Sequence, residues 1–256
     1  MGRFATTAAL YEALRPPYPP AFFRSVAGKL ALSRQSRLID LGTGPGVLAL
    51  GFAPYVGSII GVDPEPEMIA AARRAAASAG HDLVLIEGTT ETLADDIGAF
   101  DIVTIGRALH WMDREPTLAR LARLVEPSGV IAICASFSIA DIRNPWLDGY
   151  NELRRKWSPE GLWRESGTGT RTHHDLPAFF AGSAFRVAET IRVETDHAIS
   201  VHDLARRVLT FSSSSPEALG GNVDAMLRDV EAYLTPFGRD NVITEAIVSV
   251  AQIVRR

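Results

Sequence analysis

The sequence is poor in several residue types that would mark particular classes of protein. Its single cysteine, Cys134, excludes an internal disulfide and a thiolate cluster that could hold a metal. Lysine is nearly absent, because only Lys29 and Lys156 occur among 26 basic residues and the arginines are spread along the chain. Nucleic-acid binding favours a net basic chain with a concentrated basic stripe. The formal charge here is -4, so we expect no nucleic-acid partner.

Long hydrophobic runs are also missing. No window holds the roughly 18 uninterrupted apolar residues that a membrane span requires, and the N-terminal residues lack the pattern of a signal peptide. We therefore expect no membrane partner and a cytoplasmic location. Hydrophobic residues make up 46% and charged residues 22% of the 256 residues, which is typical of a globular chain with one core domain.

The first half of the chain alternates apolar runs with alanine-rich helical stretches. The runs are bounded by glycine, proline and aspartate, a pattern that indicates βαβ units and a mostly parallel sheet. This predicts a doubly wound α/β fold with helices on both faces. Seven strands are expected, at residues 37–41, 58–62, 83–87, 100–105, 130–135, 185–194 and 242–254.

Residues 38–47 hold the most informative motif, Leu-Ile-Asp-Leu-Gly-Thr-Gly-Pro-Gly-Val. A buried strand leads through three alternate glycines into a helix, and glycine allows both a tight turn and close approach of a ligand to the backbone. In a doubly wound sheet this loop lies where ligands bind. A dinucleotide fingerprint would place its third glycine at position 47, which is Val47, whereas Gly42, Gly44 and Gly46 form G-x-G-x-G.

With Asp40 two residues before the first glycine, this segment resembles motif I of the class I S-adenosylmethionine-dependent methyltransferases. Three more segments match in order. Residues 61–64 (Gly-Val-Asp-Pro) end the second strand with an acid, and residues 88–93 (Gly-Thr-Thr-Glu-Thr-Leu) resemble the family's G-D-A-E-x-L. Residues 100–113 resemble motif IV of the methyltransferase type 11 branch, which includes trans-aconitate methyltransferase-like and ubiquinone-biosynthesis-like enzymes. Residues 11–19 resemble its Y-x-x-x-R-P-x-Y-P opening.

The resemblance implies a Rossmann-like, seven-stranded sheet, with S-adenosylmethionine as cofactor and S-adenosylhomocysteine as product. Asp63 would accept hydrogen bonds from both ribose hydroxyls, with a capping role for the next helix as the alternative. Arg15 would meet the cofactor carboxylate, or would only cap a mobile first helix together with Tyr18. The family's usual acid is Thr89 here, which leaves backbone contacts from Thr89 and Thr90 to the adenine. The implied cofactor-binding residues are Tyr11, Arg15, Tyr18, Asp40, Gly42, Thr43, Gly44, Gly46, Asp63, Pro64, Met68, Thr89, Thr90, Glu91, Gly106 and Arg107.

Candidate catalytic and substrate residues follow the fourth strand and continue into an aromatic segment. His110 could take a proton from a hydroxyl or ring-nitrogen nucleophile at neutral pH, or could be a structural histidine. Arg154, Arg155 and Lys156 beside Trp157 could bind an anionic or planar aromatic substrate, or form an exposed helix face. The predicted substrate contacts are His110, Trp111, Trp146, Tyr150 and Trp157. No metal is predicted, because His173 and His174 lack a third spaced ligand.

The resemblance covers roughly residues 8–135, and after residue 136 the regular order of strands and helices breaks, which suggests how the chain is divided. Residues 1–136 would form the cofactor-binding core with an N-terminal lid. Residues 137–182 would be a cap inserted after the fifth strand, and residues 183–256 would complete the sheet. We expect methyl transfer to a small-molecule acceptor, with an oxygen or nitrogen nucleophile favoured over carbon, by a monomer or homodimer. The alternatives are a non-catalytic cofactor-binding module and, less favoured, an NAD(P)-dependent oxidoreductase.

Overall fold

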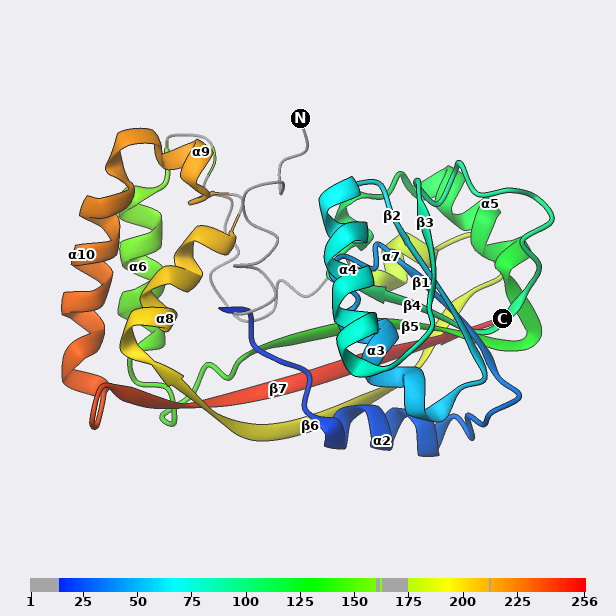
Figure 1. The fold of residues 1–256 in the computed structure, drawn as a ribbon, viewed down its shortest axis with the longest axis horizontal. Helices are drawn as coiled ribbons and strands as arrows, with labels where there is room; N and C mark the ends of the chain where they lie inside the picture. The colour runs from blue at the N-terminus through cyan, green and yellow to red at the C-terminus, as the bar shows by residue number, and fades with distance from the viewer. Residues whose placement is uncertain (1–13, 160–161, 163–174, 212) are drawn as a thin grey trace.

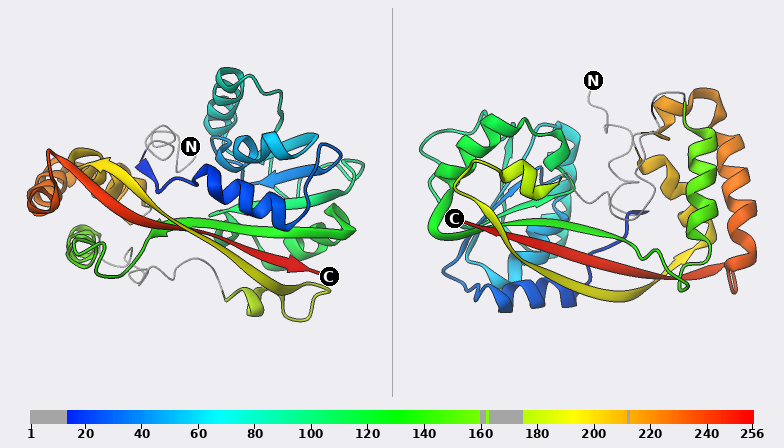
Figure 2. Two further views of the ribbon diagram at one scale, coloured as in Figure 1. Left: turned by 90° about the horizontal axis from the view of Figure 1, so that it is seen from below. Right: turned by 180° about the vertical axis from the view of Figure 1, so that it is seen from behind.

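The computed structural model describes residues 14–159, 162, 175–211 and 213–256. Two lobes lie side by side, one built around a β-sheet and one from helices, and the long strands β5, β6 and β7 run between them (Figure 1). Figure 2 shows the same arrangement from below and from behind. Among the described residues, no helix combines the length and the apolar character that a membrane crossing requires.

The sheet has seven strands in the order β3-β2-β1-β4-β5-β7-β6. Strand β7 is antiparallel to both of its neighbours, while the pairs among β1 to β5 are parallel. The predicted doubly wound, mostly parallel sheet is thus confirmed, although the last three strands begin or end beyond their predicted limits. The strands are β1 (Arg37–Leu41), β2 (Ser58–Asp63), β3 (Val84–Glu87), β4 (Phe100–Gly106), β5 (Val125–Ser138), β6 (Arg186–Ser200) and β7 (Val242–Arg255).

Helices cover both faces of this sheet. Successive residues of a strand point to opposite faces, so the apolar strands need helices on each side to bury them. Leu38 packs with α2 (Pro20–Lys29) and α3 (Val47–Phe52), whereas Ile39 packs with α5 (Arg114–Leu124) and α7 (Leu176–Phe180). Helix α4 (Pro66–Ala79) follows β2 and buries Met68, Ile69, Ala72 and Ala76. It ends at Gly80, whose φ of 68° is left-handed, as the sequence predicts.

The second lobe, called the helical lobe below, consists of α6 and residues 201–237. Its elements are α6 (Leu147–Trp157), α8 (Val201–Arg206), η3 (Arg207–Thr210), α9 (Pro216–Leu219), η4 (Gly220–Asn222), α10 (Val223–Leu234) and η5 (Thr235–Phe237). It has an apolar core of its own, to which Trp146, Val208, Met226 and Val230 contribute. Among the described residues of the predicted cap segment 137–182, α6 belongs to this lobe and α7 packs on the sheet. The other helices of the lobe come from between β6 and β7.

Candidate functional site

The glycine loop, residues 42–46, connects β1 to α3 at the carboxyl edge of the sheet. The amides of Gly42 and Thr43 both donate to the carbonyl of Val62, at 2.8 and 2.9 Å, which fastens the loop to β2. Gly42 has φ of 70°, and a Cβ there would lie 2.4 Å from the Cβ of Ala108. Gly44, with φ of 54°, has nothing within 4 Å of the position that a Cβ would take. The loop is therefore tightly packed against Ala108 at Gly42, whereas Gly44 has free space beside its α-carbon.

Asp40 lies beneath the loop and binds two threonines. Its Oδ2 accepts a hydrogen bond from Thr43 Oγ1 and its Oδ1 accepts one from Thr104 Oγ1, both at 2.7 Å. Burial raises the pKa of Asp40 to about 6. Because both oxygens are engaged, this geometry favours an indirect role, in which Asp40 anchors the loop to β4. Thr104 was not among the residues predicted from the sequence.

Asp63 ends β2 and faces the glycine loop. Its Oδ2 accepts the Gly44 amide at 2.8 Å, and its Oδ1 accepts the Glu65 amide at 3.0 Å, just before α4. Burial raises the pKa of this carboxyl. Each carboxylate oxygen has a second lone pair, so both backbone bonds are compatible with a ribose diol. Pro64 beside it is exposed, whereas Met68, in the first turn of α4, is buried.

The loop after β3 is held by a threonine that sequence reasoning missed. The Thr89 amide donates to Thr92 Oγ1 at 2.9 Å, so this backbone donor is already engaged. Thr90 is buried and its hydroxyl lies 4.0 Å from the sulfur of Met112, which follows β4. Glu91 is exposed. The predicted backbone contacts from Thr89 and Thr90 to the adenine stay predictions.

Gly106, Arg107 and Tyr18 meet where β4 ends. A Cβ on Gly106 would lie 2.7 Å from Leu48 Cδ1 and 3.9 Å from the hydroxyl oxygen of Tyr18. Arg107 has φ of 58°, and its guanidinium lies 5.1 Å from the centre of the Tyr18 ring. Its Nη2 donates to the carbonyls of Pro16 and Ser136, each at 2.8 Å. The Arg107 side chain therefore links the backbone at Pro16 to the backbone at Ser136 in β5.

Arg15 contacts the helical lobe. Its Nη2 donates to the Thr210 carbonyl at 2.6 Å, and its guanidinium lies 4.0 Å from the centre of the Phe211 ring. These contacts tie Arg15 to the residues at the end of η3, and its bond to the cofactor carboxylate stays a prediction. Tyr11 lies outside the described residues.

His110 and Trp111 lie in η2 (Leu109–Trp111), directly after β4. Both side chains are exposed, with Trp111 at 49%, and their ring centres are 4.7 Å apart. Ala108, two residues before His110, is the residue that packs against Gly42. The structure therefore brings His110 and Trp111 to the same edge of the sheet as the glycine loop.

The other predicted substrate contacts lie within the helical lobe. Trp146 and Tyr150 are only 1% and 2% exposed, and the Tyr150 hydroxyl donates to the carbonyl of Leu204 at 3.2 Å. Trp157 donates from Nε1 to Asp229 on α10. Trp146 and Tyr150 are corrected to packing residues, because buried rings offer a substrate no surface, whereas Trp157 is half-buried and its substrate contact stays a prediction. Arg154 is buried too, with its guanidinium 3.4 Å from the centre of the Phe211 ring.

The structure also bears on the prediction that no metal is bound. Within the described parts of the chain, no three His, Cys, Asp or Glu side chains gather in a way that could hold a metal. His173 and His174 lie outside those parts, and Asp175 caps α7 by accepting a hydrogen bond from the Ala178 amide.

Sequence reasoning also missed a buried ion pair between Arg207 and Glu245, which lies where β7 meets the helical lobe.

The strand order, the single antiparallel strand β7 and the G-x-G-x-G loop after β1 together define the class I methyltransferase fold. Residues 38–129 match the methyltransferase domain family. An uncharacterized methyltransferase of Mycobacterium tuberculosis is 29% identical over 150 residues, or 59% of this chain and 58% of the relative. The match thus spans little more than half the length of that relative.

Solved structures show the same fold over nearly the whole chain. A proposed type II methyltransferase from Anaeromyxobacter dehalogenans superposes with a TM-score of 0.65 at 20% identity, covering 95% of this chain and 98% of that one. An S-adenosylmethionine-dependent methyltransferase from Geobacter sulfurreducens, in complex with S-adenosylhomocysteine, has a TM-score of 0.57 at 18% identity, covering 100% and 99%. Residues 38–129 thus carry a methyltransferase domain, and the fold of the chain is that of S-adenosylmethionine-dependent methyltransferases.

Proposed function

We propose that this chain transfers a methyl group from S-adenosylmethionine to a small-molecule acceptor. The observation that carries the proposal is the pairing of the glycine loop with Asp63, in which the Gly44 amide donates to Asp63 and the Gly44 α-carbon faces open space. A Cβ would fill the space that a ligand needs at this point. The bound S-adenosylhomocysteine of the Geobacter sulfurreducens protein supports the same ligand class here.

The residues present suit each part of this cofactor. Residues 42–46 would hold its amino-acid portion against the backbone, and Asp63 would accept the ribose hydroxyls through its remaining lone pairs. Thr90, buried beside Met112, and Met68 would flank the adenine. When bound, the cofactor supplies a methyl group activated by its sulfonium charge. No covalent catalyst is required of the protein.

The protein's own task is to align the acceptor and keep water out, since methyl transfer is an in-line displacement. His110 lies at the exposed edge of the sheet beyond β4, next to Trp111. There, one of its ring nitrogens would accept the proton that an oxygen or nitrogen nucleophile loses. A carbon nucleophile remains compatible with the same arrangement. The monomeric or dimeric state and the cytoplasmic location stay predictions from the sequence.

A labelling experiment tests the acceptor class. The purified chain is incubated with S-adenosylmethionine carrying a labelled methyl group and with a cell extract divided by ultrafiltration. We expect label in products formed from the low-molecular-weight fraction, with none in the Asp63→Ala variant and normal labelling in Asp82→Ala, which changes an exposed carboxylate. Label confined to the macromolecular fraction would contradict a small-molecule acceptor. Cofactor binding without label in either fraction would favour a non-catalytic module.

A further inference from the structure

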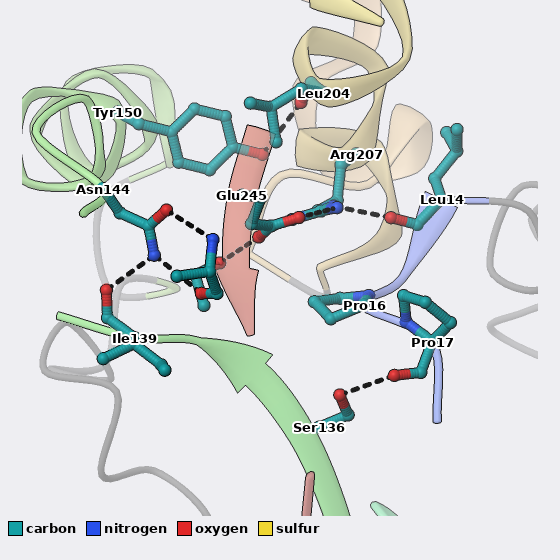
Figure 3. Close-up of polar contacts among 12 residues, drawn as sticks. Leu14, Pro16, Pro17, Ser136, Ile139, Asn144, Tyr150, Leu204, Arg207 and Glu245 are labelled. Carbon is teal, nitrogen blue, oxygen red and sulfur yellow. Dashed lines mark hydrogen bonds and ion pairs between the residues drawn. The ribbon is translucent and has the colours of Figure 1, made fainter. Parts of the chain in front are cut away.

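A buried ion pair joins the helical lobe to the sheet. Arg207 in η3 and Glu245 in β7 form two parallel bonds, Nη1 to Oε1 at 2.7 Å and Nη2 to Oε2 at 2.8 Å (Figure 3). Their side chains are 3% and 0% exposed. Ser138 at the end of β5 donates a third bond to Glu245 Oε1, at 2.5 Å. The carboxylate is thus held by both lobes, and this geometry fixes η3 against the sheet.

Arg207 has a second task, because its Nε donates to the carbonyl of Leu14 at 2.5 Å. Leu14 begins the N-terminal segment, defined here as residues 14–18. The next residue of that segment, Arg15, donates back to the Thr210 carbonyl in the same η3. Two arginines therefore hold the start of the N-terminal segment to the helical lobe: Arg207 donates from the lobe to the segment, and Arg15 donates from the segment to the lobe.

The rest of the N-terminal segment is fastened to the sheet. The Pro16 carbonyl accepts Arg107 Nη2, and the Pro17 carbonyl accepts Ser136 Oγ, each at 2.8 Å. Figure 3 shows Pro16 and Pro17 lying between Arg207 on one side and Ser136 on the other. Consecutive prolines have fixed φ angles and no amide donor, so this stretch is stiff. It can transmit a displacement of the lobe to the sheet with little bending.

The sheet end of this segment reaches the glycine loop through short steps. Arg107 lies between Gly106 and Ala108, and Ala108 packs directly against Gly42. Tyr18, the last residue of the segment, lies under the Arg107 guanidinium and against Gly106. A shift of the N-terminal segment would therefore displace Arg107 and, with it, the adjacent Ala108, which packs against Gly42 of the glycine loop.

We propose that Arg207 and Glu245 are positioning residues for the methyl-transfer site. The ion pair holds η3, Arg207 holds Leu14, and the stiff N-terminal segment holds Arg107 and the glycine loop in the geometry that binds the cofactor. Docking of the helical lobe and affinity for the cofactor are coupled through this path. The inference rests on the proposed function, since it takes the glycine loop as the cofactor site.

The first test is Arg207→Lys, measured by titration with S-adenosylhomocysteine. A lysine keeps the positive charge beside Glu245 but cannot form two parallel bonds to it and also donate to Leu14. We expect the dissociation constant to rise about tenfold, as for one lost charge-assisted hydrogen bond, and amide exchange at Leu14, Arg15 and Tyr18 to accelerate. Arg143→Lys is the matched control, because Arg143 bonds Asp141 and Glu194 at the surface.

A second variant keeps the test decisive if the first is poorly folded. The double change Arg207→Met with Glu245→Leu removes both charges together, which protein interiors tolerate better than one stranded charge. It also removes the bond to Leu14, so we expect a similar rise in the dissociation constant in a chain that still unfolds cooperatively.

Affinity within twofold of wild type in a folded variant, or an equal loss in Arg143→Lys, would overturn the proposal. Failure of the wild-type chain itself to bind S-adenosylhomocysteine would instead contradict the proposed function.

Discussion

Gly42 and Ala108 lie so close that a Cβ on Gly42 would be 2.4 Å from the Cβ of Ala108. Gly42 opens the loop after β1, and Ala108 follows β4, so this contact joins two segments that are far apart in the chain. It fixes where the turn that carries His110 lies relative to the glycine loop. The relative position of these two parts of the candidate site depends on this approach.

Replacing Gly42 by alanine should therefore destabilise the fold. The left-handed φ and the overlap with Ala108 together should lower the free energy of unfolding by about 2–4 kcal/mol. Adding Ala108→Gly removes the overlap and should restore all but about 1 kcal/mol. Urea denaturation of both variants checks this, and an equal loss in the single and double variants would show that the contact is not the cause.

At Gly44 the same substitution should act differently. A Cβ there meets nothing within 4 Å, so only the left-handed φ of 54° opposes alanine, at a cost of about 1 kcal/mol of stability. The added methyl group would occupy the space assigned to the cofactor. Gly44→Ala should thus weaken S-adenosylhomocysteine binding far more than Gly42→Ala/Ala108→Gly does, as measured by titration at a temperature where both are folded. Unaltered affinity in Gly44→Ala would place the ligand elsewhere.

Asp40 should make folding stability fall as pH rises. Its pKa is raised from 3.8 to about 6, so between these values the folded chain holds a proton that the unfolded chain has lost. Across this range the wild type should lose about 3 kcal/mol relative to Asp40→Asn, which does not titrate and can still bond both threonines. Denaturation at pH 4 and at pH 7 measures the difference. A difference that stays constant with pH would contradict the assignment.

Removing one partner of the buried ion pair between Arg207 and Glu245 should lower the free energy of unfolding more than removing one partner of an exposed pair does. Glu245→Gln leaves the Arg207 charge buried without its counter-ion, which should reduce the free energy of unfolding by about 3–5 kcal/mol. Glu194→Gln breaks the exposed pair with Arg143 and should change it by less than about 1 kcal/mol. Similar losses in the two variants, measured by urea denaturation, would argue against a special role for the buried pair.

His110 can be separated from cofactor binding. His110→Gln should bind S-adenosylhomocysteine as the wild type does, because the bond from the Gly44 amide to Asp63 and the bond from Thr43 to Asp40 hold the glycine loop without His110. With an acceptor that has an oxygen or nitrogen nucleophile, its turnover should fall about 10²- to 10⁴-fold, the usual contribution of a general base. Turnover equal to wild type would leave His110 a structural residue.

The fold and the cofactor loop could be predicted from the sequence because their signals are local. Short segments rich in apolar residues mark β1, β2 and β4, and the turn from β1 into α3 needs glycine at fixed short spacing. Asp40 and Thr43 are three residues apart, and Asp63 follows its strand directly. Each of these features lies in one short window of the chain.

The helical lobe could not be predicted in the same way, because its contacts are long-range. Tyr150 bonds Leu204, 54 residues further along, and the whole of β6 separates α6 from its partners. Trp146 and Tyr150 were assigned to the substrate site because aromatics among arginines look alike whether they are buried or exposed. Glu245 carried a usable signal, a charge within an apolar strand. Its partner Arg207 is 38 residues away and has no distinguishing pattern.

The most direct test of the central claim is isothermal titration of the purified chain with S-adenosylhomocysteine, beside NADH as the competing ligand class. We expect micromolar binding of S-adenosylhomocysteine that is lost in Asp63→Ala and retained in Asp82→Ala, and no binding of NADH. Binding of NADH alone, or S-adenosylhomocysteine binding that survives Asp63→Ala unchanged, would contradict the assignment of residues 42–46 and Asp63 as the cofactor site.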